Sequence, residues 1–189
     1  MAGRRSDTRE RIQQVALALF AEQGYEKTSL REIAEKLNVT KAALYYHFKT
    51  KEDIVASLFE DLAVSLDEIL EWVRAQDDPA RIREKLLRRV AKLVEGSFVR
   101  LWQFIQENQP TLKELHVGNP LAERMTAVLE VISAGEQDPS TQLRARLALM
   151  ALVIGNNPEV LADERRGEVA LDVALELASP RGRKVDRAT

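Results

Sequence analysis

The stretch TKAALYYHFKTKEDIV, from Thr40 to Val55, gathers side chains of the types that bind nucleic acid. It holds two tyrosines, one histidine, one phenylalanine and three lysines, although aromatic residues make up only 5% of the chain. Tyrosine, imidazole and ammonium groups donate hydrogen bonds to phosphate oxygens, and an alanine methyl can touch a thymine methyl in the major groove. The stretch therefore predicts a contact with a polyanion.

On a helix from Thr40 to about Phe48, two opposite faces separate. Leu44 and Phe48 share one face, which we expect to point inward. The outward face is small at its start and aromatic at its end, with Ala42, Ala43 and Tyr46 on it and Tyr45 and His47 on its flanks. Each of these residues taken alone is also explained by ordinary packing or a solvated surface. Together, and at this spacing, they favour DNA binding.

The spacing of apolar residues predicts the helices that must position this one. Ile12, Val15, Ala16, Leu19 and Phe20 form one helical stripe that Gly24 ends. Ser29 and Glu32 have the spacing of a capping box and open a second helix through Leu37. Thr40 is a suitable N-cap for the third helix. Three short helices, the last two joined by a tight turn, predict a helix-turn-helix.

A long fourth helix is predicted from Lys51 to about Ala75, and Lys51 at its start, beside free backbone amides, suggests an anion site. Prolines divide the rest of the chain into further helices, about nine in total. No segment alternates convincingly as a strand. We expect an all-α fold with a helix-turn-helix domain at residues 1–50, a larger helical domain at 51–180, and a basic flexible tail at 181–189.

Composition and charge limit the class of protein. The 189 residues are 45% hydrophobic and contain no cysteine, which excludes disulfides, thiolate metal sites and cysteine nucleophiles. The most apolar run, residues 147–155, is far short of the roughly 20 residues that span a bilayer. No apolar signal segment follows the N-terminal arginines. We expect a cytoplasmic protein with no cofactor and no metal.

Positive charge is concentrated near the N-terminus. Residues 1–52 contain ten Lys/Arg and seven Asp/Glu, a net charge of +3, whereas the other 137 residues carry a net charge of −5. A basic segment on an acidic body favours contact with nucleic acid. A difference of this size also arises by chance, so charge alone leaves both explanations open.

One continuous segment of the sequence resembles a known protein family. The segment ALALFAEQGYEKTSLREIAEKLNVTKAALYYHFKTKEDIV strongly resembles the DNA-binding region of TetR-family transcriptional regulators, over roughly residues 8–56. The resemblance implies an all-α dimer of about nine helices, with three helices in the DNA-binding head and a variable body that binds a ligand and dimerises. It also implies DNA contacts by Thr28, Arg31, Thr40, Lys41, Ala42, Ala43, Tyr45, Tyr46, His47 and Lys51.

A head that reads only a few base pairs needs a second copy in the next major groove, about 34–36 Å away. The two last apolar helices, residues 140–155 and 166–179, are the expected dimer interface. Its predicted residues are Leu147, Met150, Ala151, Ile154, Val169, Val173 and Leu177. The alternative is that these helices close the core of a monomer.

The middle of the body mixes aromatic and polar residues, as a small-molecule pocket requires. The candidate pocket residues are Phe98, Trp102, Phe104, His116 and Met125. An aromatic stripe of this kind is more often plain core.

We expect a repressor that binds a palindromic operator as a homodimer and is released by a small-molecule effector. One alternative is a DNA-binding dimer without a ligand. The other is a helical enzyme, although the sequence offers no catalytic constellation and only two histidines.

Overall fold

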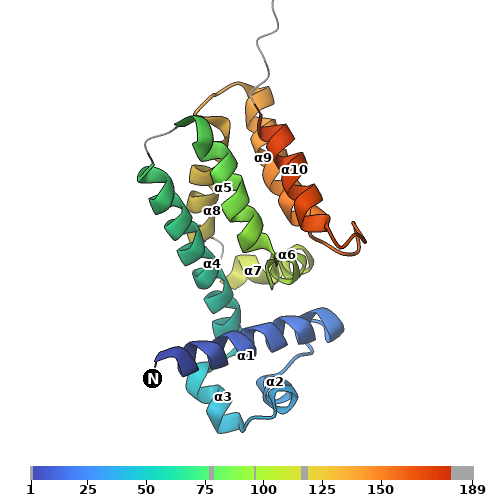
Figure 1. Ribbon diagram of the computed structural model, residues 1–189. Coiled ribbons are helices and arrows are strands. Elements are labelled where there is room, and N and C mark those ends of the chain that lie inside the picture. The colour runs from blue at the N-terminus through green and yellow to red at the C-terminus, as the bar shows by residue number, and fades with distance from the viewer. Residues whose placement is uncertain (1, 77–78, 96, 116–118, 180–189) are drawn as a thin grey trace, which may run out of the picture.

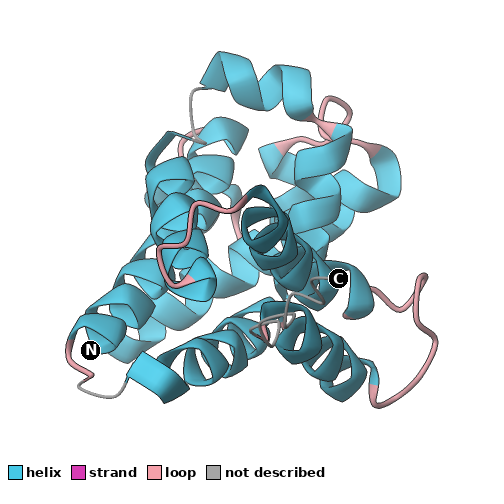
Figure 2. Cartoon of the chain, turned by 90° about the horizontal axis from the view of Figure 1, so that it is seen from above, coloured by secondary structure: helices cyan, strands magenta, loops and turns pink. Residues whose placement is uncertain are grey.

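The computed structural model describes residues 2–76, 79–95, 97–115 and 119–179, and within these ranges every regular element is a helix (Figure 2). The all-α prediction is confirmed. Ten helices are seen in these ranges where about nine were expected, and Asn108 alone separates α6 from the short α7. The helices are α1 (Ala2–Gln23), α2 (Leu30–Leu37), α3 (Lys41–His47), α4 (Lys51–Arg74), α5 (Pro79–Val94), α6 (Ser97–Glu107), α7 (Gln109–Leu115), α8 (Asn119–Ser133), α9 (Pro139–Gly155) and α10 (Arg166–Ala178).

Local signals set the ends of the first helices. Gly24, with a φ of +90°, follows the end of α1, a conformation that glycine adopts without steric cost. Ser29 and Glu32 form the predicted capping box at the start of α2. The α2 C-cap, Asn38, adopts the left-handed conformation with φ +54°, which asparagine tolerates better than most residues. These caps fix the short connection that brings α3 against α2.

The helices are arranged in two tiers joined by α4 (Figure 1). α1, α2 and α3 lie together at one end, and α4 rises from them along one side of the remaining helices. α5 and α8 pack against α4, while α9 and α10 lie side by side on the opposite side of the body. The helix that follows the DNA-binding candidate is therefore also a wall of the body.

One apolar core runs through both tiers. It includes Phe20 and Leu44 near the N-terminal end and Leu86, Val128 and Leu152 in the body. Because the buried side chains form a single cluster, the packing of the first three helices is not independent of the packing of the body.

α9 and α10 approach each other closely. Gly155 lies against Ala170, and a Cβ built at Gly155 would be 2.6 Å from the Cβ of Ala170. Small residues thus let the two helix backbones pack tightly, and Ala170 and Ala174 are buried in the contact. The outer faces of both helices are left toward solvent.

The division into domains at residue 50 stays a prediction, and the predicted tail at 181–189 lies outside the described residues. No helix in the described ranges combines the length and apolarity needed to cross a membrane.

Candidate nucleic-acid interface

α3 is held by its buried face and by its N-cap. Leu44 is fully buried and Phe48 is 4% exposed, so the predicted inward face is the observed one. The hydroxyl of Thr40 accepts a hydrogen bond from the backbone N–H of Ala43 at 3.1 Å. Thr40 therefore serves the helix as its cap, and its exposed position leaves it beside the outward surface.

The outward face of α3 is open to solvent. Lys41, Ala42 and Ala43 are exposed, and Tyr46 has 63% of its surface accessible. Exposure of so large a ring in a chain with few aromatic residues is unusual for a side chain with only a packing role. The surface is flat at its start, where a groove floor can approach the backbone, and aromatic at its end.

Tyr45 and His47 are half-buried on the flanks of this face. The ammonium of Lys41 lies 5.2 Å from the centre of the Tyr45 ring. The His47 ring stands edge-on to the Tyr46 ring, with 5.4 Å between ring centres. These contacts orient the polar groups around the exposed face without closing it.

Arg31 projects from α2 beside this surface and is paired with Glu35. Its Nε donates to Glu35 Oε1 at 2.7 Å, and its side chain is 78% exposed. The hydrogen bond and the charge of Glu35 raise the pKa of Arg31. Exposed ion pairs one helical turn apart contribute little to stability, because solvent screens both charges. A phosphate or base edge can therefore replace Glu35 as the partner at low cost.

The structure does not support a phosphate contact by the Thr28 side chain. Thr28 is 2% exposed. Its hydroxyl donates to the carbonyl of Gly24 at 2.8 Å and accepts from Gln23 Nε2 at 3.2 Å. Thr28 instead fastens the loop between α1 and α2.

Lys51 also differs from the expectation. Its Nζ donates to the carbonyl of Tyr25 at 2.8 Å and lies 4.2 Å from the centre of the Tyr25 ring. The N-terminal amides of α4 are served by a capping box formed by Thr50 and Asp53. Since Asp53 also accepts from the backbone N–H of Lys49, protein carboxylate already occupies the predicted anion site.

A hydrogen bond between Tyr25 and Glu52 completes this junction. The Tyr25 hydroxyl donates to Glu52 Oε1 at 2.9 Å. Burial raises the pKa of Tyr25, and the bond to Glu52 adds to the rise. Burial acts to raise the pKa of Glu52, but backbone and side-chain hydrogen bonds and the charge of Lys51 outweigh it, so the pKa is lowered. Tyr25, Lys51 and Glu52 thus tie the α1–α2 loop to the start of α4.

A second link between α1 and α4 was missed from the sequence. Gln13 is 4% exposed, and its Nε2 donates to Ser57 Oγ at 2.8 Å and to Asp61 Oδ2 at 2.6 Å. Arg9 Nη1 donates to Asp61 Oδ1 at 2.8 Å. The signal available was the matched four-residue spacing of Arg9 and Gln13 on one helix and Ser57 and Asp61 on the other.

The candidate pocket residues are not gathered around one described cavity. Phe98 lines a cavity of about 280 Å³ between α1, α4, α5 and α6, but Trp102 and Met125 do not line it and are packed against the core. Phe104 is 3% exposed and contacts the rings of Phe20 and Tyr25. His116 lies outside the described residues. In this arrangement Phe104 has a packing role.

The candidate dimer residues lie on the outer faces of α9 and α10. Leu147, Ile154, Val169 and Val173 are each between 39% and 44% exposed. Met150, Ala151 and Leu177 are half-buried beside them. Large apolar side chains exposed together on two adjacent helices are typical of interaction surfaces.

Known proteins are similar to this chain in the sequence of its helix-turn-helix and in the fold of most of its length. The sequence model of the family described as "Bacterial regulatory proteins, tetR family" matches residues 12–58. The chain is 39% identical to the HTH-type transcriptional regulator AcrR of Shigella flexneri over 83 residues, a match that covers 43% of this chain and only 39% of AcrR.

Other relatives extend the match into the body. The HTH-type transcriptional regulator TtgR of Pseudomonas putida is 29% identical over 167 residues, which cover 79% of this chain and 78% of TtgR. The crystal structure of Mycobacterium smegmatis AmtR matches the fold with a TM-score of 0.68 and 25% identity, over 92% of this chain and 87% of AmtR. With the exposed helix-turn-helix and the helical body behind it, these findings show that the chain is similar to the TetR family of transcriptional regulators, in sequence over residues 12–58 and in fold over most of its length.

Proposed function

We propose that this DNA-binding regulator is a repressor that binds a palindromic operator as a homodimer and is released by a small-molecule effector. The observation that carries the DNA-binding part is the outward face of α3, where Lys41, Ala42, Ala43 and Tyr46 are exposed above a buried Leu44. The alanines let the backbone approach base edges, and the surrounding polar groups contact phosphates.

The exposure of these side chains supports a specific set of proposed DNA contacts. Ala42 and Ala43 face the bases, and Lys41 lies beside them with its ammonium donating to a phosphate. Tyr46 and the flanking Tyr45 and His47 hold the backbone, and Arg31 exchanges Glu35 for DNA. Thr40 lies at the edge of the surface as the cap of α3. We leave the side chains of Thr28 and Lys51 out of the direct contacts, because both are used inside the protein.

The dimer part of the proposal rests on the apolar outer faces of α9 and α10. A two-fold axis through these faces would make a four-helix interface and leave both α3 helices on the same side of the assembly. α4 has 24 residues, about 36 Å of helix, so small changes in its tilt move the heads appreciably. Release requires that the effector bind more tightly to a body whose heads no longer fit successive grooves.

Selection of bound sites from random duplex DNA tests the proposal. We expect an enriched palindrome whose half-sites repeat at about one helical turn, 10–10.5 base pairs centre to centre, or a multiple of it. Tyr46→Ala should weaken binding to the selected duplex. Val64→Ala is the control, because Val64 is also exposed but lies on α4, and this variant should bind as the parent does. Selection that yields no common sequence would refute base reading by α3. Equal affinity of parent and Tyr46→Ala proteins with unchanged helicity would remove Tyr46 from the proposed backbone contacts.

A further inference from the structure

Two arginines from different helices converge on the end of α10. Arg83 of α5 donates from Nη1 to the carbonyl of Ala178 at 2.9 Å. Arg144 of α9 donates from Nη2 to the carbonyls of Glu176 and Ser179 at 3.0 and 3.2 Å. The last carbonyls of a helix lack partners within the helix and carry its negative dipole end. The two guanidinium groups, which come from α5 and α9, therefore cap the C-terminal end of α10.

These cations are only partly satisfied. The Nε of Arg83 is buried and has no hydrogen-bond partner. Within the described chain, the hydrogen bonds of Arg83 and Arg144 go to backbone carbonyls, and neither guanidinium forms an ion pair with a carboxylate. A buried donor without an acceptor is destabilising, and more so when the group is charged. The two guanidinium groups therefore have no carboxylate partner within the described residues.

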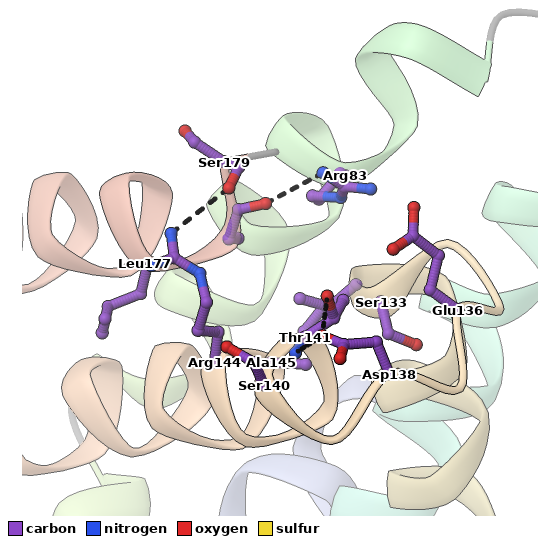
Figure 3. Close-up of a pocket in the computed structure, with 12 residues that line it drawn as sticks. Arg83, Ser133, Glu136, Asp138, Ser140, Thr141, Arg144, Ala145, Leu177 and Ser179 are labelled. Atoms are coloured by element: carbon purple, nitrogen blue, oxygen red, sulfur yellow. Dashed lines mark hydrogen bonds between the residues drawn. The ribbon is translucent and has the colours of Figure 1, made fainter. Parts of the chain in front are cut away.

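A cavity of about 380 Å³ lies beside these arginines. Figure 3 shows its walls, which come from α5, the segment between α8 and α9, the start of α9 and the end of α10. Its volume is in the range of small-molecule sites, roughly 300–1,000 Å³. The cavity is therefore large enough for a metabolite and is separate from the cavity that Phe98 lines.

The chemistry of the walls restricts the ligand. Hydroxyl groups line the cavity at Ser133, Ser140, Thr141 and Ser179. Two carboxylates also line it, and that of Asp138 already accepts from the N–H of Thr141 at 2.9 Å as the cap of α9, whereas Glu136 is exposed. The apolar part of the wall consists of Ile132, Ala145, Leu177 and Ala178. A ligand here needs an oxyanion for the arginines and hydrogen-bonding hydroxyls for the rest.

We propose that this cavity binds a small hydroxylated oxyanion, of the class of sugar acids and sugar phosphates. Its carboxylate or phosphate accepts hydrogen bonds from Arg83 and Arg144, whose planar forks match both groups. Its hydroxyls bond to Glu136 and to the serine and threonine side chains of the wall.

The site connects to the proposed dimer face through α10. Both arginines hold the end of the helix that carries Val169 and Val173. A bound oxyanion adds charge-assisted bonds to the same guanidinium groups and so fastens α10 to α5 and α9. The binding inference stands without DNA; only the description of the ligand as an effector rests on the proposed function.

Calorimetric titration of the DNA-free protein tests the site. The probes are sodium gluconate, which carries a carboxylate, and glucose 6-phosphate, which carries a phosphate, at constant ionic strength set with chloride. Glucose is the uncharged counterpart. We expect saturable binding of at least one anion and none of glucose, and the stronger anion identifies the preferred oxyanion. Absence of saturable binding by both anions at millimolar concentration would overturn the proposal.

Matched arginine variants assign the binding to the cavity. Arg83→Gln and Arg144→Gln should each weaken binding about tenfold or more, since each removes a charge-assisted bond. Arg88→Gln on α5 and Arg146→Gln on α9 change exposed arginines of the same helices away from the cavity and should bind as the parent does. Equal affinities of all four variants, or equal losses in all four, would contradict the assignment.

A variant at the rim of the cavity distinguishes loss of binding from loss of structure. Ser140 is exposed at the cavity wall, so Ser140→Trp should block entry while both arginines and their bonds to α10 remain. We expect loss of anion binding with unchanged helicity by circular dichroism. Undiminished binding by this variant would exclude the cavity. Because none of these measurements uses DNA, their outcome is independent of operator binding.

Discussion

The ring of Phe20 in α1 lies 5.4 Å from the ring of Phe104 in α6, measured between ring centres, and both rings also contact Tyr25. This aromatic cluster joins the first tier of helices to the body. All three residues are nearly fully buried, so movement of the body relative to α1 must carry the cluster with it or break it. The cluster is therefore a mechanical connection between the body and the helices that carry the proposed DNA-binding surface.

Phe104→Ala should destabilise the protein by about 3–5 kcal/mol, the usual cost of truncating a buried phenylalanine. Urea denaturation followed by circular dichroism measures the change. Phe98→Ala is the matched control on the same helix; Phe98 is half-buried, so its truncation should cost clearly less. Equal losses of unfolding free energy in the two variants would show that the aromatic cluster adds no stability at Phe104.

Lys41→Ala should reduce the salt dependence of operator binding. Each phosphate contact contributes about 0.9 to the slope of log affinity against log salt. Two subunits in one complex therefore predict a slope smaller by about 2 for this variant. Lys85→Ala, an exposed lysine on α5, should leave the slope unchanged. A change of about 1 would point to one bound subunit, and an unchanged slope would remove Lys41 from the phosphate contacts.

Leu147→Glu combined with Val173→Glu should convert a dimer to monomers, because two charges per subunit would be buried in an apolar interface without partners. Analytical ultracentrifugation measures the state directly. Val64→Glu, at a 57% exposed valine on α4, is the control. If the double variant sediments like the parent protein, or if the parent is itself a monomer, the outer faces of α9 and α10 are not the dimer interface.

Gly155→Ala should destabilise the pair of helices α9 and α10. The new Cβ would lie 2.6 Å from the Cβ of Ala170 and 3.2 Å from its Cα, and overpacking of this kind costs typically about 1–3 kcal/mol. Thermal denaturation is the measurement. Gly167→Ala is the control, since its Cβ would meet only side-chain oxygens, at 3.3 and 3.5 Å. A parent-like melting temperature for Gly155→Ala would mean that the helices separate without cost.

Glu52 should contribute a pH-dependent part of the stability. Its pKa is lowered in the folded protein from a reference value of 4.5. A lowered folded-state pKa stabilises the protein above the unfolded-state pKa, and this stabilisation is lost as the pH falls through the lowered value. Tyr25→Phe removes one of the bonds that lower it. The difference in unfolding free energy between this variant and the parent should therefore shrink as the pH falls below about 4.5.

Denaturation curves at neutral and acid pH compare the two proteins. Ser29→Ala provides a comparison with a carboxyl on the surface. It removes the hydrogen bond that lowers the pKa of Glu32, whereas Glu52 is partly buried. A Tyr25→Phe difference that stays constant across the acid range would show that Glu52 does not respond to the Tyr25 hydroxyl.

Short-range sequence patterns were sufficient for the helix-turn-helix. The Ser29–Glu32 capping box, the Thr40 cap, Gly24 and the apolar positions of α2 are all observed. Each depends on residues within about one or two helical turns, and such local interactions are determined by the adjacent residues alone. The exposed face of α3 follows from the same spacing once Leu44 and Phe48 are buried.

Only the tertiary structure decided the partners of side chains far apart in the chain. Lys51 has the spacing of a phosphate ligand, yet its ammonium bonds to Tyr25, and Thr28 is taken into the loop beside α1. Phe104 and Trp102 look alike in sequence, but only Phe104 meets the aromatic rings of α1 and the following loop. Arg83 and Arg144 are far apart in the sequence and meet only because α10 ends between them. Helical periodicity determines which face of a helix is apolar, whereas the packing of several helices at once determines what each side chain on that face touches.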